Sequence, residues 1–289
     1  METNVIVESD GLKLSGRFHC PDNLGTNETR PAFICTHGFG GSKIDGSMAS
    51  VCPWLCDKGY IALCLDSRGC GESAGQRGNI IPQEQVLDLG HALTWLAKQD
   101  GVDAERIVLL GDSLGAAVSL FAGGTDQRVA GVVAVGGWGN GAAKIALQHA
   151  GPGMMDKYLE MLANGKAHRE QHGTEMMVSR FDIVPIPEHM RGNLPEDAIM
   201  EFTAATAQAI YDFRPSDVIG NLAPRPLLLV HASRDRVTPT DSSIEVWGYA
   251  NLPKDMVLLS DVDHFPLAVG NARIYDVIAG WLDLYFPLS

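Results

Sequence analysis

The sequence has 289 residues, of which 45% are apolar and 20% are charged, and its formal net charge at pH 7 is −13. This length and composition indicate one large globular domain with an insertion, which can fold without a disulfide or a metal. The negative charge would repel phosphate backbones and anionic lipid, so we expect neither nucleic acid nor a membrane as a partner.

The first ten residues are acidic and alternate in character, unlike the basic start and apolar run of a signal peptide. No stretch approaches the roughly 18 uninterrupted apolar residues that a membrane helix requires. We therefore expect a soluble, cytoplasmic protein.

Apolar runs and helical patterns alternate along the first half of the chain. Residues 5–7 and 13–20 flank a turn-forming Ser-Asp-Gly and predict an opening β-hairpin. Further short runs, rich in β-branched residues, predict strands that are buried on both faces. These strands cover residues 32–36, 61–65, 106–110, 129–135 and 226–231, with helical patterns at 47–58, 82–99 and 113–123. The alternation predicts an α/β fold with a mostly parallel central sheet flanked by helices.

The alternation stops after residue 135 and resumes near residue 226, which indicates an insertion between the two halves of a core domain. Proline and glycine punctuate this segment, so we expect several short helices joined by loops. A helical pattern covers residues 155–162, a polar stretch covers 164–174, and a final helix is expected from residue 195 to about 213.

The strongest local signal is the G-x-S-x-G sequence at residues 111–115, directly after a predicted strand and before a predicted helix. A turn this tight needs small flanking residues, and it projects the Ser113 hydroxyl above the sheet at the start of the helix. Free N–H groups at a helix start favour developing negative charge. Ser113 is therefore the candidate nucleophile, although a glycine-rich helix start can also serve packing alone.

A nucleophilic serine needs a base, because a neutral hydroxyl reacts poorly until an imidazole removes its proton. His264 is the best candidate, since it follows the apolar run at residues 256–259, which reads as the last strand. Most other histidines lie in a helical pattern, in a strand or in the insertion.

The carboxylate that orients the imidazole is expected at a neighbouring strand end. Asp235 follows the strand at residues 226–231, and its loss should cost orders of magnitude in turnover. Asp241, Asp261 and Asp263 remain rivals. The chain order Ser, Asp, His is that of α/β-hydrolases and differs from the orders in chymotrypsin and subtilisin.

A glycine-rich loop, residues 37–41, follows the strand at residues 32–36 and can turn a backbone N–H toward the serine. We expect the N–H groups of Phe39 and Leu114 to form an oxyanion hole. The loop lacks the lysine ending of a P-loop and the spacing of a dinucleotide site.

With these segments in place, the chain resembles the α/β-hydrolase superfamily along nearly its whole length. Within it, the chain resembles bacterial serine hydrolases grouped with dienelactone hydrolases and X-Pro dipeptidyl-peptidase-like hydrolases. The resemblance rests on residues 37–43, 66–73, 111–115, 224–226, 231–235 and 263–264. True dienelactone hydrolases carry cysteine in place of Ser113, so a dienelactone substrate is not implied.

The resemblance implies a core domain of residues 1–137 and 215–289, with a helical cap at 138–214 inserted after the sixth strand. Substrate choice is expected to depend on this cap. Trp138 and nearby methionines are candidates for an apolar substrate-binding lining, although such residues also build a cap's own core. Apolar surface on the cap or a sheet edge would allow a homodimer.

The favoured function is a serine hydrolase that cleaves a small ester, lactone or thioester, with no metal or organic cofactor. Carbon–carbon bond hydrolysis of a diketone or phenolic ketone would use the same three residues. A peptidase would want an acidic pair in the cap, for which Glu170, Glu175 and Asp182 are available. A non-catalytic small-molecule sensor would have no need to retain a complete Ser, Asp and His set.

Overall fold

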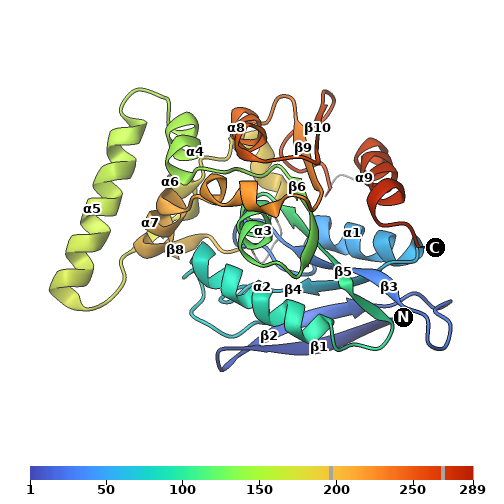
Figure 1. The fold of residues 1–289 in the computed structure, drawn as a ribbon. Coiled ribbons are helices and arrows are strands. Elements are labelled where there is room, and N and C mark those ends of the chain that lie inside the picture. The colour runs from blue at the N-terminus through green and yellow to red at the C-terminus, as the bar shows by residue number, and fades with distance from the viewer. Residues whose placement is uncertain (195–197, 268–270, 289) are drawn as a thin grey trace.

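The computed structural model describes residues 1–194, 198–267 and 271–288. An eight-stranded sheet runs through this part of the chain, with helices on both faces (Figure 1). Its strands are β1 (Glu2–Ser9), β2 (Leu12–His19), β3 (Arg30–Thr36), β4 (Ile61–Leu65), β5 (Val102–Asp112), β6 (Val129–Val135), β9 (Leu227–Ala232) and β10 (Lys254–Leu259).

The strands lie in the order β1-β2-β4-β3-β5-β6-β9-β10. β1 and β2 form the predicted antiparallel hairpin, and β2 pairs antiparallel with β4. All pairs from β4 to β10 are parallel, so the carboxyl ends of these strands lie at one edge of the sheet. The expected α/β fold with a mostly parallel sheet is confirmed.

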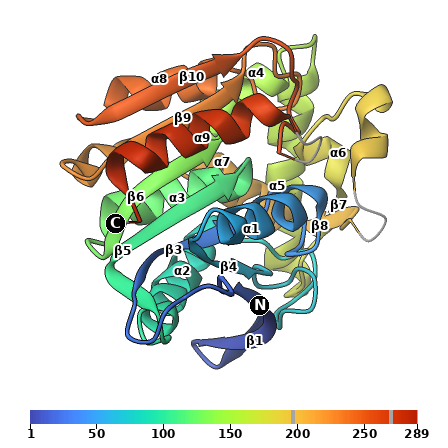
Figure 2. The same cartoon turned by 90° about the vertical axis from the view of Figure 1, so that its right-hand side faces the viewer.

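Helices α1 (Gly46–Asp57) and α9 (Ala272–Tyr285) pack on one face of the sheet (Figure 2). Helices α2 (Pro82–Leu96), α3 (Leu114–Thr125) and α8 (Asp241–Tyr249) pack on the other. Because the sheet is covered twice, both faces of each central strand must be apolar.

Strand β3 shows how its short run of apolar residues supplies two cores. Phe33 and Cys35 belong to the cluster that includes α1 and α9, whereas Ala32 and Ile34 belong to the cluster that includes α2 and α3. All four side chains are fully buried. Successive side chains of a strand point to opposite faces, so an uninterrupted apolar run serves both.

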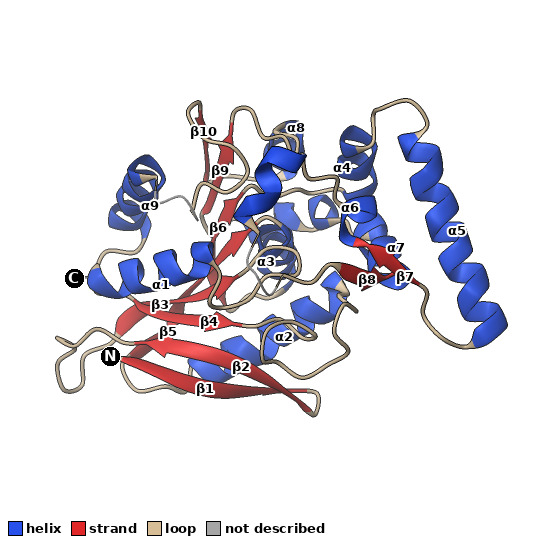
Figure 3. Cartoon of the chain, turned by 180° about the vertical axis from the view of Figure 1, so that it is seen from behind, coloured by secondary structure: helices blue, strands red, loops and turns tan. Residues whose placement is uncertain are grey.

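The segment at residues 138–214, called the inserted segment below, follows β6, the sixth strand of the chain, and lies on one side of the sheet (Figure 3). The long helix α5 forms its outer edge in Figure 1. Its elements are α4 (Gly141–Gln148), α5 (Met154–His172), β7 (Met177–Ser179), α6 (Arg180–Ile183), the 3-10 helix η1 (Glu188–Asn193), β8 (Glu201–Thr203) and α7 (Ala204–Asp212). Two more 3-10 helices, η2 (Pro215–Asp217) and η3 (Ile219–Leu222), lead back to the core.

Two expectations for the inserted segment are wrong in detail. The helix expected at residues 155–162 runs from Met154 to His172, so it continues through most of the polar stretch at 164–174. Its side chains are largely exposed, so no apolar periodicity marks this part of the helix. The expected helix from residue 195 begins only at Ala204, after the short strand β8, and residues 195–197 lie outside the described ranges. Within those ranges, no helix is both long and apolar enough to cross a membrane.

Candidate active site

Ser113 lies between the end of β5 and the start of α3, in the strand-to-helix turn that the sequence predicts. Its backbone has φ 56° and ψ −112°, a conformation that L-residues rarely adopt. The N–H of Ser113 donates to the carbonyl of Val135 on the neighbouring strand at 2.8 Å, which holds this conformation in place. The turn aims the hydroxyl away from the sheet.

The two glycines of the motif are required by the close approach of backbone to backbone. A Cβ atom at Gly115 would lie 2.4 Å from the carbonyl oxygen of Thr36, and one at Gly111 would lie 2.3 Å from the carbonyl oxygen of Gly115. Neither distance leaves room for a side chain, so β5, α3 and β3 can meet at the serine only with glycine at both positions.

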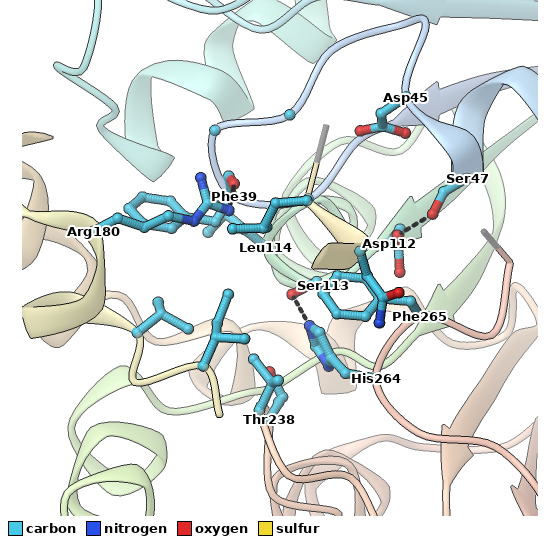
Figure 4. A pocket seen from close by; sticks show the side chains of 18 of the residues that line it. Phe39, Asp45, Ser47, Asp112, Ser113, Leu114, Arg180, Thr238, His264 and Phe265 are labelled. Carbon is cyan, nitrogen blue, oxygen red and sulfur yellow. Dashed lines mark hydrogen bonds between the residues drawn. The ribbon is translucent and has the colours of Figure 1, made fainter. Parts of the chain in front are cut away.

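The structure brings Ser113, His264 and Asp235 together from three strand ends, and Figure 4 shows Ser113 beside His264. The Ser113 Oγ lies 3.0 Å from His264 Nε2, and His264 Nδ1 lies 2.8 Å from Asp235 Oδ2. Both the His264 and the Asp235 side chains are at most 4% exposed. These contacts form a continuous hydrogen-bonded relay from a buried carboxylate to a serine hydroxyl.

The relay perturbs both of its ionisable groups. Burial alone would lower the pKa of His264, but the charge and hydrogen bond of Asp235 outweigh it and raise the pKa above its ordinary value. Burial would raise the pKa of Asp235, yet the neighbouring imidazoles hold it well below the usual range. Asp235 is therefore ionised at neutral pH and stabilises a protonated His264.

Asp235 is held by contacts beyond His264. Its Oδ1 accepts the N–H groups of Val237 and Thr238 at 2.8 and 2.7 Å. On its other side, the Nε2 of His231 lies 3.2 Å from Oδ2. In the sequence His231 is only the last residue of the predicted strand at 226–231, and this position does not indicate that its side chain contacts Asp235.

The three rival carboxylates make other contacts. Asp263 accepts the backbone N–H of His264 at 2.9 Å, and not the ring. Asp261 pairs with Arg273, and Asp241 begins helix α8.

The predicted oxyanion donors, Phe39 and Leu114, both line the pocket in front of Ser113. Within the described ranges, neither backbone N–H donates a hydrogen bond to another group. His37 fixes the loop, because its Nε2 accepts the Ser67 N–H at 3.0 Å, which leaves Nδ1–H to donate to the Gly38 carbonyl at 2.8 Å. Among the described residues, the Phe39 N–H in this loop and the Leu114 N–H at the start of α3 are therefore both without an acceptor.

A family model described as serine aminopeptidase, S33, matches residues 27–264 of this chain. The chain belongs to the serine aminopeptidase S33 family. The family lies in the α/β-hydrolase superfamily, so the resemblance to that superfamily and the predicted fold are both confirmed.

Among the relatives of this S33 chain is an uncharacterized 31.7 kDa protein of Escherichia coli, 26% identical over 91% of each chain. A thiohydrolase of Aspergillus aculeatus is 25% identical over 94% of this chain and 92% of its own. A polyketide transferase of a Penicillium species is 26% identical over 91% of this chain and 89% of its own. Its crystal structure superposes with a TM-score of 0.81, at 22% identity and 99% coverage of both chains.

The pocket of this S33 chain lies between the core and the inserted segment. From the core it is lined by the loop at 38–41, by Ser113 and by His264, and from the inserted segment by residues that include Trp138 and Ile210. Trp138 is 1% exposed and packs edge-on against Phe213, so it belongs both to the pocket wall and to the core of the inserted segment. Glu170, Glu175 and Asp182 do not line the pocket as the structure describes it.

Arg180 was not predicted from the sequence as a functional residue, yet the structure places it against the loop at residues 38–41. It begins α6 of the inserted segment and is 5% exposed. Its Nη2 donates to the carbonyl of Phe39 at 2.6 Å, and its guanidinium lies 5.3 Å from the Phe39 ring centroid. Phe39 also stacks on Phe202. The inserted segment thus holds Phe39, one of the two predicted oxyanion donors, in place.

Asp112, directly before Ser113, is a further carboxylate at the pocket wall. Its Oδ2 accepts the hydroxyl of Ser47 at 2.7 Å, and burial raises the pKa of Asp112 to about 6. Its other oxygen has no hydrogen-bond partner in the described residues. The G-x-S-x-G motif allows any residue between Gly111 and Ser113, so it could not predict that Asp112 is buried at the pocket wall.

Proposed function

We propose that this protein is a serine hydrolase that cleaves an ester, lactone or thioester of a small substrate through an acyl-enzyme on Ser113. One observation carries the proposal: the relay from Asp235 through His264 reaches a serine hydroxyl at the wall of a pocket. The free N–H groups of Phe39 and Leu114 beside that hydroxyl support acyl chemistry in particular, since a tetrahedral intermediate carries its charge on oxygen.

In the first half-reaction, the Ser113 Oγ attacks the acyl carbon while its proton passes to His264 Nε2. The carbonyl oxygen becomes an oxyanion that accepts from the Phe39 and Leu114 N–H groups, each worth about 3 kcal/mol in comparable sites. The intermediate collapses, the bond to the leaving oxygen or sulfur breaks, and His264 returns the proton to the leaving atom. The acyl group stays on Ser113.

In the second half-reaction, water replaces the leaving group. His264 takes a proton from the water as its oxygen attacks the acyl carbon, and a second oxyanion forms in the same site. Collapse breaks the bond to the Ser113 Oγ, which recovers its proton from His264, and the carboxylic acid is released. Asp235 remains ionised throughout and stabilises the imidazolium that forms in each half.

Thioesters are the favoured subclass among these substrates, because one relative is named as a thiohydrolase and another as a polyketide transferase. Carbon–carbon bond hydrolysis is the alternative, since it would use the same residues. Hydrolysis of matched 4-nitrophenyl esters, acyl thioesters and 1,3-diketones with one acyl chain separates these possibilities. We expect turnover of both the ester and the thioester, with the larger kcat/KM for the thioester. Turnover of the diketone alone would overturn the acyl-transfer proposal.

Arg180 is a positioning residue in this scheme, because it acts through Phe39. An Arg180→Met variant should lose the donor to the Phe39 carbonyl and loosen the N–H that faces the oxyanion. We expect kcat to fall roughly 10- to 100-fold with little change in KM, since small misplacements at a reacting centre have effects of this size. Arg180→Lys should recover part of kcat, because it restores a cationic donor.

The matched control for Arg180 is Arg191→Met. Arg191 also lies in the inserted segment and covers the Phe181 ring at 3.9 Å, but it does not line the pocket. Steady-state kinetics and the rate of Ser113 labelling by a fluorophosphonate are measured for all three variants. If Arg180→Met and Arg191→Met had the same kcat, Arg180 would contribute to folding only and would not position Phe39.

A further inference from the structure

Lys144 is a buried cation that the proposed chemistry does not use. It lies on α4, is 4% exposed and lines the same pocket as Ser113 and His264. Its Nζ lies 5.5 Å from the centroid of the Trp138 ring. Among the described residues, Nζ makes no ion pair and no hydrogen bond, and the carboxylate whose charge acts on its pKa is that of Asp235.

A buried ammonium without a partner is unfavourable, because it loses its hydration without gaining a counter-ion. Burial accordingly lowers the pKa of Lys144 to about 7, although the charge of Asp235 opposes the shift. The contact with the Trp138 ring offsets only part of this cost. An apolar residue of similar length would fill the same space without this desolvation cost. The positive charge of Lys144 therefore indicates a site for a negative group that comes from a ligand.

The second cation at the pocket wall is in a similar position. Arg180 donates to the backbone carbonyls of Phe39 and Ile199, and the structure shows no carboxylate paired with it among the described residues. The carboxylates of the pocket, Asp45 and Asp112, lie on the opposite side of Ser113 from Arg180 in Figure 4. Part of the pocket of a protein with net charge −13 is therefore cationic.

We propose that Lys144 binds a carboxylate of the substrate, so that the acyl compound this protein cleaves is anionic. The inference rests on the proposed hydrolase function and names its substrate class. The carboxylate is distinct from the acyl carbon that Ser113 attacks, and it serves as an anchor: Lys144 supplies a charge-assisted hydrogen bond in a site shielded from water, where such a bond is strong.

Anion binding also acts on the catalytic relay. The positive charge of Lys144 is one of the influences that lower the pKa of His264. A bound carboxylate neutralises that charge and thereby makes His264 a stronger base when the substrate is in place. The expected preference for an anionic substrate therefore appears both in KM and, to a smaller extent, in kcat.

The test uses two 4-nitrophenyl esters of the same shape. One is the mono-4-nitrophenyl ester of glutaric acid, whose free carboxylate makes it a monoanion. The other is the 4-nitrophenyl ester of glutaramic acid, in which an uncharged amide replaces that carboxylate. Wild type should prefer the monoanion, and Lys144→Met should lower kcat/KM for the monoanion roughly 10- to 100-fold while the amide changes little. Lys144→Arg should retain a preference for the monoanion. Lys157→Met, on the neighbouring helix α5, is the matched control and should behave as wild type. An equal loss on both esters, or no preference in wild type, would overturn the proposal.

A binding measurement keeps this test separate from the hydrolase proposal. Hexanoate and hexanamide are titrated calorimetrically into Ser113→Ala and into the Ser113→Ala, Lys144→Met double variant. We expect hexanoate to bind more tightly than hexanamide to the first protein, and equally weakly to the second. If wild type cleaves neither ester but hexanoate binding depends on Lys144, the hydrolase proposal fails and the anion site stands. Hexanoate binding that is absent, or unchanged by the Lys144 substitution, refutes the anion site.

Discussion

Replacing Ser113 with alanine is expected to lower kcat/KM for 4-nitrophenyl esters by roughly 10⁴- to 10⁶-fold, since losses of this size follow removal of the nucleophile of a Ser-His-Asp triad. The variant keeps the fold, because alanine removes only the hydroxyl, and the backbone bond to the Val135 carbonyl does not involve the side chain. Turnover of an ester series from acetate to decanoate measures the loss, and the chain-length optimum of wild type reports the size of the pocket.

Ser50→Ala is the control for that experiment. Ser50 lies in α1, does not line the pocket, and its hydroxyl donates to the Gly46 carbonyl within the helix, so its loss should leave turnover unchanged. A fluorophosphonate should label wild type and Ser50→Ala at Ser113, and should not label Ser113→Ala. Ester hydrolysis that persists in Ser113→Ala at the wild-type rate would rule out an acyl-enzyme on this serine.

Replacing Asp235 with asparagine is expected to lower kcat by roughly 10⁴-fold, because the amide can no longer hold the imidazole in the reactive tautomer or stabilise its charged form. The pH profile supplies a second readout. His264 must be neutral to accept the Ser113 proton, so activity is lost as pH falls through its pKa, which Asp235 raises above the ordinary histidine value. In the variant this acidic limb moves to lower pH, since the carboxylate charge is gone.

Asp263→Asn is the matched comparison, since Asp263 contacts the backbone of His264 and not its ring. We expect it to lower kcat far less than Asp235→Asn and to leave the pH profile in place. If Asp263→Asn gave the larger loss, or if the acidic limb of Asp235→Asn stayed where it is in wild type, Asp235 would not be the partner of the imidazole.

The fold could be predicted from the sequence for those elements whose burial determines which residue types they contain. Strands β4 and β6 begin and end at the predicted residues, since a strand covered on both faces must be apolar throughout and turns interrupt it sharply. Helix α5 was predicted at less than half of its length, because its exposed second half shows no apolar stripe. Short strands such as β7, with three residues, are below the length at which a period of two can be recognised.

The candidate site likewise contains residues that the sequence predicts and residues that it does not. Ser113, Asp235 and His264 follow from local motifs at strand ends, and the parallel sheet brings those ends to one edge. Lys144 and Arg180 lie in the inserted segment, where a sequence shows charge but not burial. Their importance comes from what packs around them, and that depends on contacts between segments far apart in the chain, such as Arg180 with Phe39.

The hydrogen bond from Arg180 to the Phe39 carbonyl limits how freely such a protein can change its specificity during evolution. The inserted segment leaves the core after β6 and returns before β9, and these two strands are neighbours in the sheet. A lineage could therefore exchange the whole segment without altering the register of any strand. A replacement that lacked a donor at the place of Arg180 would no longer hold the loop at residues 38–41. A change of substrate specificity and a new contact that holds this loop would then have to be acquired together.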